Sequence, residues 1–266
     1  MIQTYFGLSK PPFGEQDIAL LPHQQEILDT LLVHCRQGGL CLLLGEPGSG
    51  KSTIKQALQK HDEKNLIAPV VARSLHTHLN TLRILCEAFG VDYFTDVFKC
   101  EKSLIEEALR LKRHGKMIAP IIDDAHFMPM DCLRRLRLMF EDFPKNHNLI
   151  LIGQPTLMST LSLTVHEDIK SRVTYSVLLH KLAPDDLQAF ILDQLDRAGL
   201  GHNAFTEAAL ALVVRSAQGS IRAARNLCIS ALIEAVRDQT RTVDIGQVNR
   251  VLIQPHWRAN DDLSQP

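Results

Sequence analysis

Eight consecutive residues near the start of the chain have the spacing of a phosphate-binding loop. Residues 45–52 read Gly-Glu-Pro-Gly-Ser-Gly-Lys-Ser, which fits the pattern G-x-x-x-x-G-K-[S/T]. The glycines allow successive backbone N–H groups to turn toward an anion without a clash from a Cβ atom. The lysine gives a compact charge to the β- and γ-phosphates, and the hydroxyl after it is a ligand for Mg²⁺. The predicted ATP-binding residues are Gly45, Glu46, Pro47, Gly48, Ser49, Gly50, Lys51, Ser52 and Thr53, with Lys51 also a catalytic group.

Two adjacent acids provide the carboxylates that such a site needs beside the phosphates. Asp123 and Asp124 follow an apolar run at residues 117–122. An acid at the end of a strand next to the loop holds the metal, so Asp123 is predicted to bind Mg²⁺ together with Ser52. Asp124 is predicted to orient or deprotonate the attacking water. The acidic pattern alone is common, because many strands run into an acidic turn, and His126 is more simply a turn or core residue.

These residues need a parallel sheet to hold them. Residues 40–44 are wholly apolar, as in a strand buried on both faces, and residues 52–60 have a helical pattern directly after the loop. Further strands are expected at 68–72, 117–122, 148–152 and, more weakly, 173–178. A helix is expected at 23–37, before the first strand, and others are expected between the strands at 79–89, 101–113 and 130–143. This alternation predicts an α/β fold with helices on both faces of the sheet.

After about residue 182 the sequence changes to helical patterns alone. Four helices are expected, at 184–198, 206–217, 220–237 and 244–252. The predicted parts are an α/β nucleotide-binding core with an N-terminal arm (1–180), a helical lid (181–255) and a flexible tail (256–266).

Composition is that of an ordinary globular protein. Hydrophobic residues make up 45% and charged residues 22% of the 266, and the net charge is −1. A nucleic-acid surface must therefore be a local patch, such as 110–116 or 134–137, each of which is alternatively the solvated face of a helix. Six cysteines without a C-x-x-C pair predict reduced thiols. Since neither a leader nor an apolar run of ~20 residues is seen, we expect a cytoplasmic protein without a membrane span.

Five motifs, in order, resemble the AAA+ ATPases of the ExeA/GspA type and the related transposon helper ATPases TniB, TnsC and MuB. The resemblance extends from residue 1 to about residue 253. It implies the AAA+ P-loop NTPase fold, with an αβα core and a small helical lid, and ATP hydrolysis with Mg²⁺. The motifs are Tyr5–Phe13, Gly45–Ser52, Asp123–His126, Leu151–Pro155 and Gly219–Cys228.

The resemblance also implies roles for three residues outside the loop. Gln154 corresponds to sensor 1, a polar residue near the γ-phosphate, and Arg222 to sensor 2, which reaches the phosphates from the lid. Arg172 corresponds to a finger that completes the ATP site of the next subunit, with Lys170 and Arg225 as alternatives. Such a finger stabilises transition-state charge, so a homo-oligomer is implied.

One departure concerns the rate of hydrolysis. The family usually has Glu where this chain has Asp124, and the shorter side chain favours slow turnover. Ile221 in place of a family Pro is a smaller departure.

Three functions follow from the resemblance. The favoured one is a DNA-transposition helper that oligomerises with ATP on double-stranded DNA and acts with a transposase. The first alternative is a secretion-assembly ATPase, which is disfavoured because the sequence reaches Pro266 without a membrane span or a peptidoglycan-binding domain. The second alternative is a nucleotide switch with little turnover.

Overall fold

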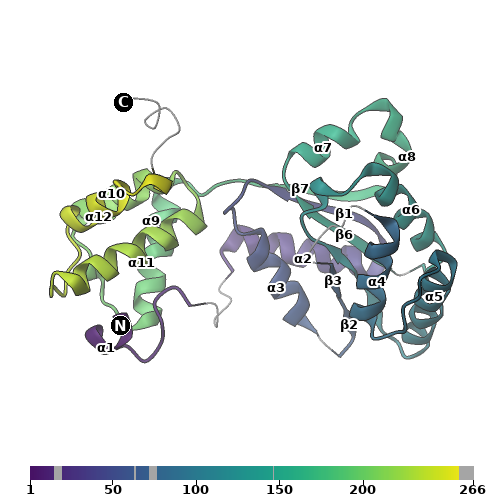
Figure 1. Ribbon diagram of the computed structural model, residues 1–266, viewed down its shortest axis with the longest axis horizontal. Coiled ribbons are helices and arrows are strands. Elements are labelled where there is room, and N and C mark those ends of the chain that lie inside the picture. The colour runs from purple at the N-terminus through teal and green to yellow at the C-terminus, as the bar shows by residue number, and fades with distance from the viewer. Residues whose placement is uncertain (15–19, 63, 72–76, 146, 258–266) are drawn as a thin grey trace. The chain divides into compact units, whose positions relative to one another are not determined.

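The computed structural model describes residues 1–14, 20–62, 64–71, 77–145 and 147–257 (Figure 1). Contacts between residues divide the chain into two compact units. The sheet unit consists of the described residues in Ile18–Glu46 and Lys51–Leu179. The helical unit consists of those in Met1–Asp17, Pro47–Gly50 and His180–Pro266.

A five-stranded parallel sheet forms the centre of the sheet unit. Its order is β3-β5-β6-β1-β7, and every neighbouring pair is parallel. The first strand in the chain thus pairs with the two strands that come last in it. Because all strands run the same way, their carboxyl ends share one edge. The strands are β1 (Gly39–Gly45), β3 (Val70–Val71), β5 (Ile121–Ile122), β6 (Asn148–Gly153) and β7 (Val173–Leu179).

Prolines interrupt two strands that the sequence predicts as continuous. Short strands β2 (Leu66–Ile67) and β4 (Met117–Ile118) pair with each other ahead of β3 and β5. Pro69 and Pro120 lie in the gaps, where a residue without an N–H cannot donate to a ladder. Backbone bonds continue across both gaps, from Ala119 N–H to Ile67 O (2.9 Å) and from Ile121 N–H to Pro69 O (2.8 Å). The strand predicted at 68–72 therefore begins earlier and is broken, and residue 72 lies outside the described residues.

Helices cover both faces of the sheet. β1 alternates between two buried clusters, with Leu40, Leu42 and Leu44 in one and Cys41 and Leu43 in the other. Each leucine so buried contributes about 2 kcal/mol of transfer free energy. Figure 1 shows the helices of the two clusters on opposite sides, as the sequence predicts. The first cluster is closed by α4 (His78–Phe89), α5 (Val97–Arg113) and α6 (Met130–Glu141), and the second by α2 (Pro22–Gln37) and α3 (Lys51–His61).

Capping residues set where the helices begin. The Asp96 side chain accepts from Lys99 N–H at 2.9 Å, so α5 starts four residues before the predicted 101. Thr77 caps α4 in the same way, and Gly90 ends it in a left-handed conformation. Among the described residues of the sheet unit, the remaining helices are short: α7 (Thr156–Leu161), α8 (Glu167–Lys170) and two 3-10 turns, Ala125–Phe127 and Thr164–His166.

The helical unit contains the four helices predicted at the end of the chain. Thr206 and Ser220 cap α10 and α11 through their hydroxyls, and Asp244 caps α12. The short helix α1 (Ile2–Phe6) contacts α11. The division by function into core, lid and tail stays a prediction. The elements are α9 (Pro184–Ala198), α10 (Glu207–Ala217), α11 (Ile221–Arg237), α12 (Ile245–Leu252) and 3-10 turns His202–Ala204 and Pro255–Trp257.

All six cysteines, each within the described residues, are free and buried, as the sequence predicts. Among the described helices, none is long and apolar enough to cross a membrane.

Candidate functional site

The glycine-rich loop connects a buried strand to a helix. β1 ends at Gly45 and α3 begins at Lys51. Gly48 and Gly50 have φ values of +82° and +101°, conformations that a residue with a Cβ rarely adopts. Backbone N–H groups at the start of α3 carry the positive end of the helix dipole. The strand–loop–helix arrangement that a phosphate loop requires is therefore present.

Two polar groups of the loop are arranged to accept a phosphate. Lys51 Nζ donates to Gly45 O at 2.6 Å and to Glu46 O at 2.8 Å, so the ammonium lies over the loop. Ser49 is buried, and its Oγ has no hydrogen-bond partner among the described residues. A buried hydroxyl without a partner costs about 1–3 kcal/mol, which a phosphate oxygen within reach would recover. These features fit an oxyanion ligand.

The middle of the loop contacts the start of α11 within the helical unit. Ile221 N–H donates to Gly48 O at 3.0 Å. A Cβ atom at Gly48 would lie 2.2 Å from Ser220 Oγ and 3.2 Å from Arg222 Cβ, so only glycine fits there. The helix cap thus places Arg222, which is exposed, one residue beyond this contact.

The acid predicted to bind metal lies at the carboxyl edge of the sheet. Asp123 N–H donates to Val71 O at 3.0 Å, which fixes its backbone to β3. Its Oδ1 accepts from Asp124 N–H at 3.0 Å, and its Oδ2 accepts from Lys55 Nζ at 2.5 Å. Lys55 lies one turn after Lys51 on α3, so both lysines face the same side of the helix. Sequence reasoning missed Lys55, although its four-residue spacing from Lys51 was a signal.

Asp124 has an unusual backbone conformation. Its φ of +52° and ψ of +35° are left-handed, and it is the residue before the 3-10 turn Ala125–Phe127. Among residues other than glycine, Asp and Asn adopt this region most readily, because their short polar side chains bond locally. The side chain of Asp124 is exposed.

His126 lies against the end of β6. A Cβ at Gly153 would lie 3.3 Å from His126 N and 3.5 Å from its Nδ1. Both ring nitrogens are buried without a partner in the part of the chain that the structure describes. Gln154, half-buried, follows Gly153 directly. The ends of β5 and β6 therefore bring Asp123, Asp124, His126 and Gln154 to one edge of the sheet.

Comparison with known proteins agrees with this arrangement. The family model described as "AAA domain" matches residues 34–161. Over 99% of its length the chain resembles the Cdc6p protein of Pyrobaculum aerophilum, with a TM-score of 0.72, 16% identity and 74% of that chain covered. Over 93% of its length it resembles the RuvB motor of Thermotoga maritima, with a TM-score of 0.60, 15% identity and 72% of that chain covered. It also resembles the Aeropyrum pernix ORC1 protein solved with DNA, over 89% of this chain and 66% of that one, with a TM-score of 0.70 and 18% identity. The chain has the AAA+ P-loop NTPase fold.

A second similarity, to a protein sequence, extends over nearly the whole chain. General secretion pathway protein A of Aeromonas hydrophila is 29% identical over 260 residues, which are 94% of this chain and 47% of that protein. The chain thus spans about half the length of the relative it matches. This similarity agrees with the ExeA/GspA resemblance among the AAA+ proteins.

The predicted finger, Arg172, directly precedes β7 in the sequence, and its guanidinium lies near the end of α6. Arg172 is exposed, and its Nη2 lies 3.4 Å from Glu141 Oε1. The same carboxylate oxygen accepts from Arg137 Nη1 at 2.6 Å. Arg172 is therefore held loosely by a residue of α6, with most of its side chain accessible.

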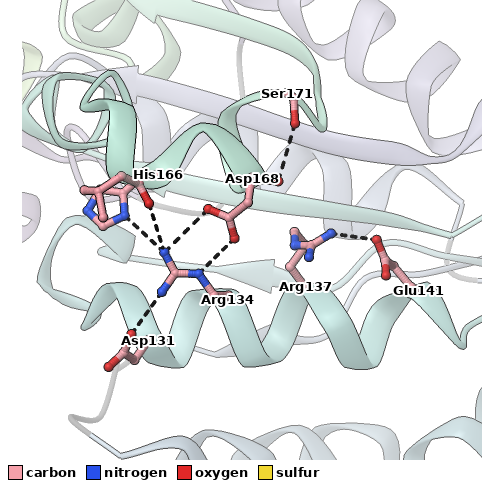
Figure 2. A network of polar contacts seen from close by, with 8 residues as sticks. Asp131, Arg134, Arg137, Glu141, His166, Asp168 and Ser171 are labelled. Carbon is pink, nitrogen blue, oxygen red and sulfur yellow. Dashed lines mark hydrogen bonds and ion pairs between the residues drawn. The ribbon is translucent and has the colours of Figure 1, made fainter.

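Arg134 ties α6 to the segment that precedes Arg172 (Figure 2). Its Nε donates to Asp168 Oδ2 at 2.8 Å, and its Nη1 donates to Asp131 Oδ1 at 3.0 Å. Its Nη2 reaches Val165 O and His166 Nδ1, both at 3.3 Å. The guanidinium lowers the pKa of the Asp168 carboxyl through this hydrogen bond.

These contacts change the interpretation of the basic stretch at 134–137. Arg134 and Arg137 form ion pairs within the chain, whereas Arg135 is exposed. In the stretch at 110–116, Arg110 pairs with Glu107 at 2.6 Å, while Lys112 and Arg113 are exposed at the end of α5. The charge available to a polyanion is therefore smaller than the sequence alone indicates.

Proposed function

We propose that this chain binds ATP with Mg²⁺ and hydrolyses it at the Gly45–Ser52 loop. The observation that supports the proposal most is the meeting of α3 with the acidic edge of β5. Lys51 and Lys55 rise from the first two turns of α3, and Asp123 faces that helix from the neighbouring sheet edge. In a P-loop NTPase the loop lysine binds the phosphates and a carboxylate nearby holds Mg²⁺, so both must lie beside the start of this helix.

Each residue has a physical task in this proposal. Backbone N–H groups of Gly48 to Ser52 and the Lys51 ammonium would bind the phosphates. Ser52 and Asp123 would hold Mg²⁺, which when bound neutralises charge on the β- and γ-phosphates. No three His, Cys, Asp or Glu side chains gather into a metal cluster within the described chain, so the phosphates would supply further ligands.

The water and the γ-phosphate need groups at the sheet edge. Asp124 would orient or deprotonate the attacking water, and Gln154 would donate a hydrogen bond to the γ-phosphate or the water. Arg222 would reach the phosphates from the start of α11.

An oligomer is part of the proposal. Arg172 is 63% exposed in its side chain, which leaves its guanidinium accessible to a second copy of the chain. An arginine supplied across an interface stabilises charge in the transition state of phosphoryl transfer. We therefore propose that the active form is a homo-oligomer in which Arg172 completes a neighbour's site.

The cellular process is proposed from the relatives. General secretion pathway protein A matches almost the whole chain, which supports a role in nucleotide-driven assembly of a secretion apparatus, from the cytoplasmic side. The second candidate is a DNA-transposition helper that acts with a transposase on double-stranded DNA. It is supported by the transposon-helper resemblance and by the exposed Lys112 and Arg113.

One pair of experiments tests both levels. Equilibrium titration with a fluorescent ATP analogue should show tight binding that Mg²⁺ strengthens; no binding would remove the ATPase proposal. Fluorescence anisotropy with labelled duplex DNA, with ATP and at several salt concentrations, separates the processes. Binding that falls steeply with salt favours the DNA role. Absence of DNA binding at low salt favours the secretion role.

A pair of variants tests whether the exposed charges of α5 contribute to DNA binding. Lys112→Glu should weaken DNA binding if they do, whereas the control Lys60→Glu should not.

A further inference from the structure

Lys55, a second lysine of α3, forms an ion pair with Asp123, the acid that the proposed function assigns to Mg²⁺ binding. Lys55 Nζ lies 2.5 Å from Asp123 Oδ2, and the two side chains are only 17% and 20% exposed. The other carboxylate oxygen accepts the Asp124 N–H at 3.0 Å. Both oxygens of Asp123 thus have donors from within the chain.

In this ion pair the Lys55 ammonium contacts the carboxylate that Mg²⁺ would use as a ligand. A carboxylate that holds Mg²⁺ or its water ligands gives its lone pairs and its charge to the metal. An ammonium on the same carboxylate has the same sign of charge as the metal, so the two compete for it. Since the pair is shielded from water on most sides, its attraction is screened less than that of an exposed pair.

We propose that Lys55 is a built-in competitor of Mg²⁺ for Asp123, which rests on the proposed function of the loop. Lys55 neutralises the carboxylate in the metal-free protein and must withdraw or share it when the metal enters with ATP. The site consequently needs more Mg²⁺ than it would with a neutral residue at position 55. Lys55 is a positioning residue: it acts through Asp123 rather than on the nucleotide.

A purely structural ion pair makes a different prediction. If the pair only joins α3 to β5, then its removal lowers thermal stability and leaves the dependence of ATP affinity on Mg²⁺ unchanged. The competitor role instead shifts that dependence. The readout is therefore the Mg²⁺ concentration that gives half of the metal-linked gain in ATP affinity, which does not require turnover.

The test compares Lys55→Gln with the wild type by titration of a fluorescent ATP analogue, in EDTA and over a series of Mg²⁺ concentrations. We expect the half-effective Mg²⁺ concentration to fall about three- to tenfold, the range for a partly buried ion pair. Lys55→Arg keeps the positive charge, so its half-effective Mg²⁺ concentration should stay near that of the wild type. Lys60→Gln, an exposed lysine at the end of the same helix, is the matched control.

Two results separate the possible failures. An unchanged or higher Mg²⁺ requirement in folded Lys55→Gln would overturn the competitor role and leave the ATP site intact. A wild type whose ATP affinity ignores Mg²⁺ would overturn the proposed function and this inference with it. If Lys55→Gln does not fold, as judged by circular dichroism, Lys55→Met keeps the aliphatic stem of the side chain and gives the same comparison.

Discussion

At the scale of single residues, the backbone of Asp124 gives a physical reason for an aspartate where the resembling family has glutamate. Asp adopts a φ of +52° more readily than Glu, because a short polar side chain can bond the local backbone. The same geometry places a short carboxylate at the edge of the sheet. Local conformation and reach toward the water thus favour different residues at one position.

Asp124→Glu should therefore raise turnover and lower stability together. The longer side chain reaches closer to the attacking water, while the left-handed backbone costs about 1 kcal/mol more. Steady-state phosphate release and a thermal melt on the same samples measure both effects. Asp124→Asn, which keeps the local geometry, should bind ATP but lose most turnover. Equal rates for Asp124→Glu and the wild type would contradict the argument from side-chain length.

Lys51→Ala should abolish tight ATP binding. The ammonium that now lies against Gly45 O and Glu46 O is the loop's fixed charge for the phosphates. Isothermal titration should show an affinity loss of at least about tenfold, near 1.4 kcal/mol. Lys60→Ala is the control on the same helix and should bind like the wild type. Unchanged affinity in Lys51→Ala would argue against the loop as the phosphate site.

At the scale of elements, α6 holds the segment before β7 in place. Arg134 contacts Asp168 and the 164–166 turn (Figure 2). Glu141, at the end of the same helix, contacts Arg172. One helix therefore positions the candidate finger at both ends of α8. Changes in α6 should affect hydrolysis without touching the phosphate loop.

Arg172→Ala should lower ATPase activity at least tenfold and leave ATP affinity nearly unchanged, since the finger acts in the transition state. Mixing it with Asp124→Asn tests action across an interface. The first protein has an intact loop and the second an intact finger, so a mixed oligomer should regain activity. Lack of recovery in a mixture that forms oligomers would assign Arg172 to its own subunit or to no catalytic role. Arg241→Ala, an exposed arginine of the helical unit, is the matched control.

The elements also show how far sequence alone reaches. The apolar run of β1, the glycine loop and the helices α9 to α12 are local patterns, and the structure contains them nearly as predicted. The strands broken at Pro69 and Pro120, and the start of α5 at the Asp96 cap, each depend on a single residue. A pattern of apolar residues over a whole segment does not show such single-residue effects. The Lys55–Asp123 pair joins residues 68 apart, so spacing could suggest only one side of it. The ion pair of Arg134 with Asp168 was hidden for the same reason, because the two residues are 34 apart in the sequence.

At the scale of the whole molecule, every thiol is buried, and this gives a measurable signal. Burial raises the pKa of Cys35 and of Cys86 to about 12, and it raises the pKa of Cys228 further. At pH 8 these three side chains are therefore almost entirely thiols, although unperturbed thiols with a pKa near 8.5 would be partly ionised.

We expect a thiol-reactive dye to label the native protein slowly at pH 8 and all six cysteines rapidly in denaturant. Since Cys228 lies in the helical unit and the others lie in the sheet unit, mass spectrometry of labelled peptides can follow each unit separately. Earlier labelling of Cys228 in rising denaturant would show that the helical unit opens first. Fast labelling of native Cys35 would contradict the burial of this side chain on the inner face of α2. A chain with Cys228→Ser serves as the assignment control.

The order of strands in the sheet has a consequence for how the protein is made. β1 pairs on both sides with strands that come last in the sheet unit, and Cys41 and Thr174, adjacent across β1 and β7, are 133 residues apart. On the ribosome, the apolar strand β1 must therefore remain unpaired on both edges until β6 and then β7 have been synthesised. At ~5–20 residues per second this exposure lasts many seconds. Nascent chains stalled before residue 148 should accordingly bind chaperones through the residues of β1, and release them once β7 has emerged.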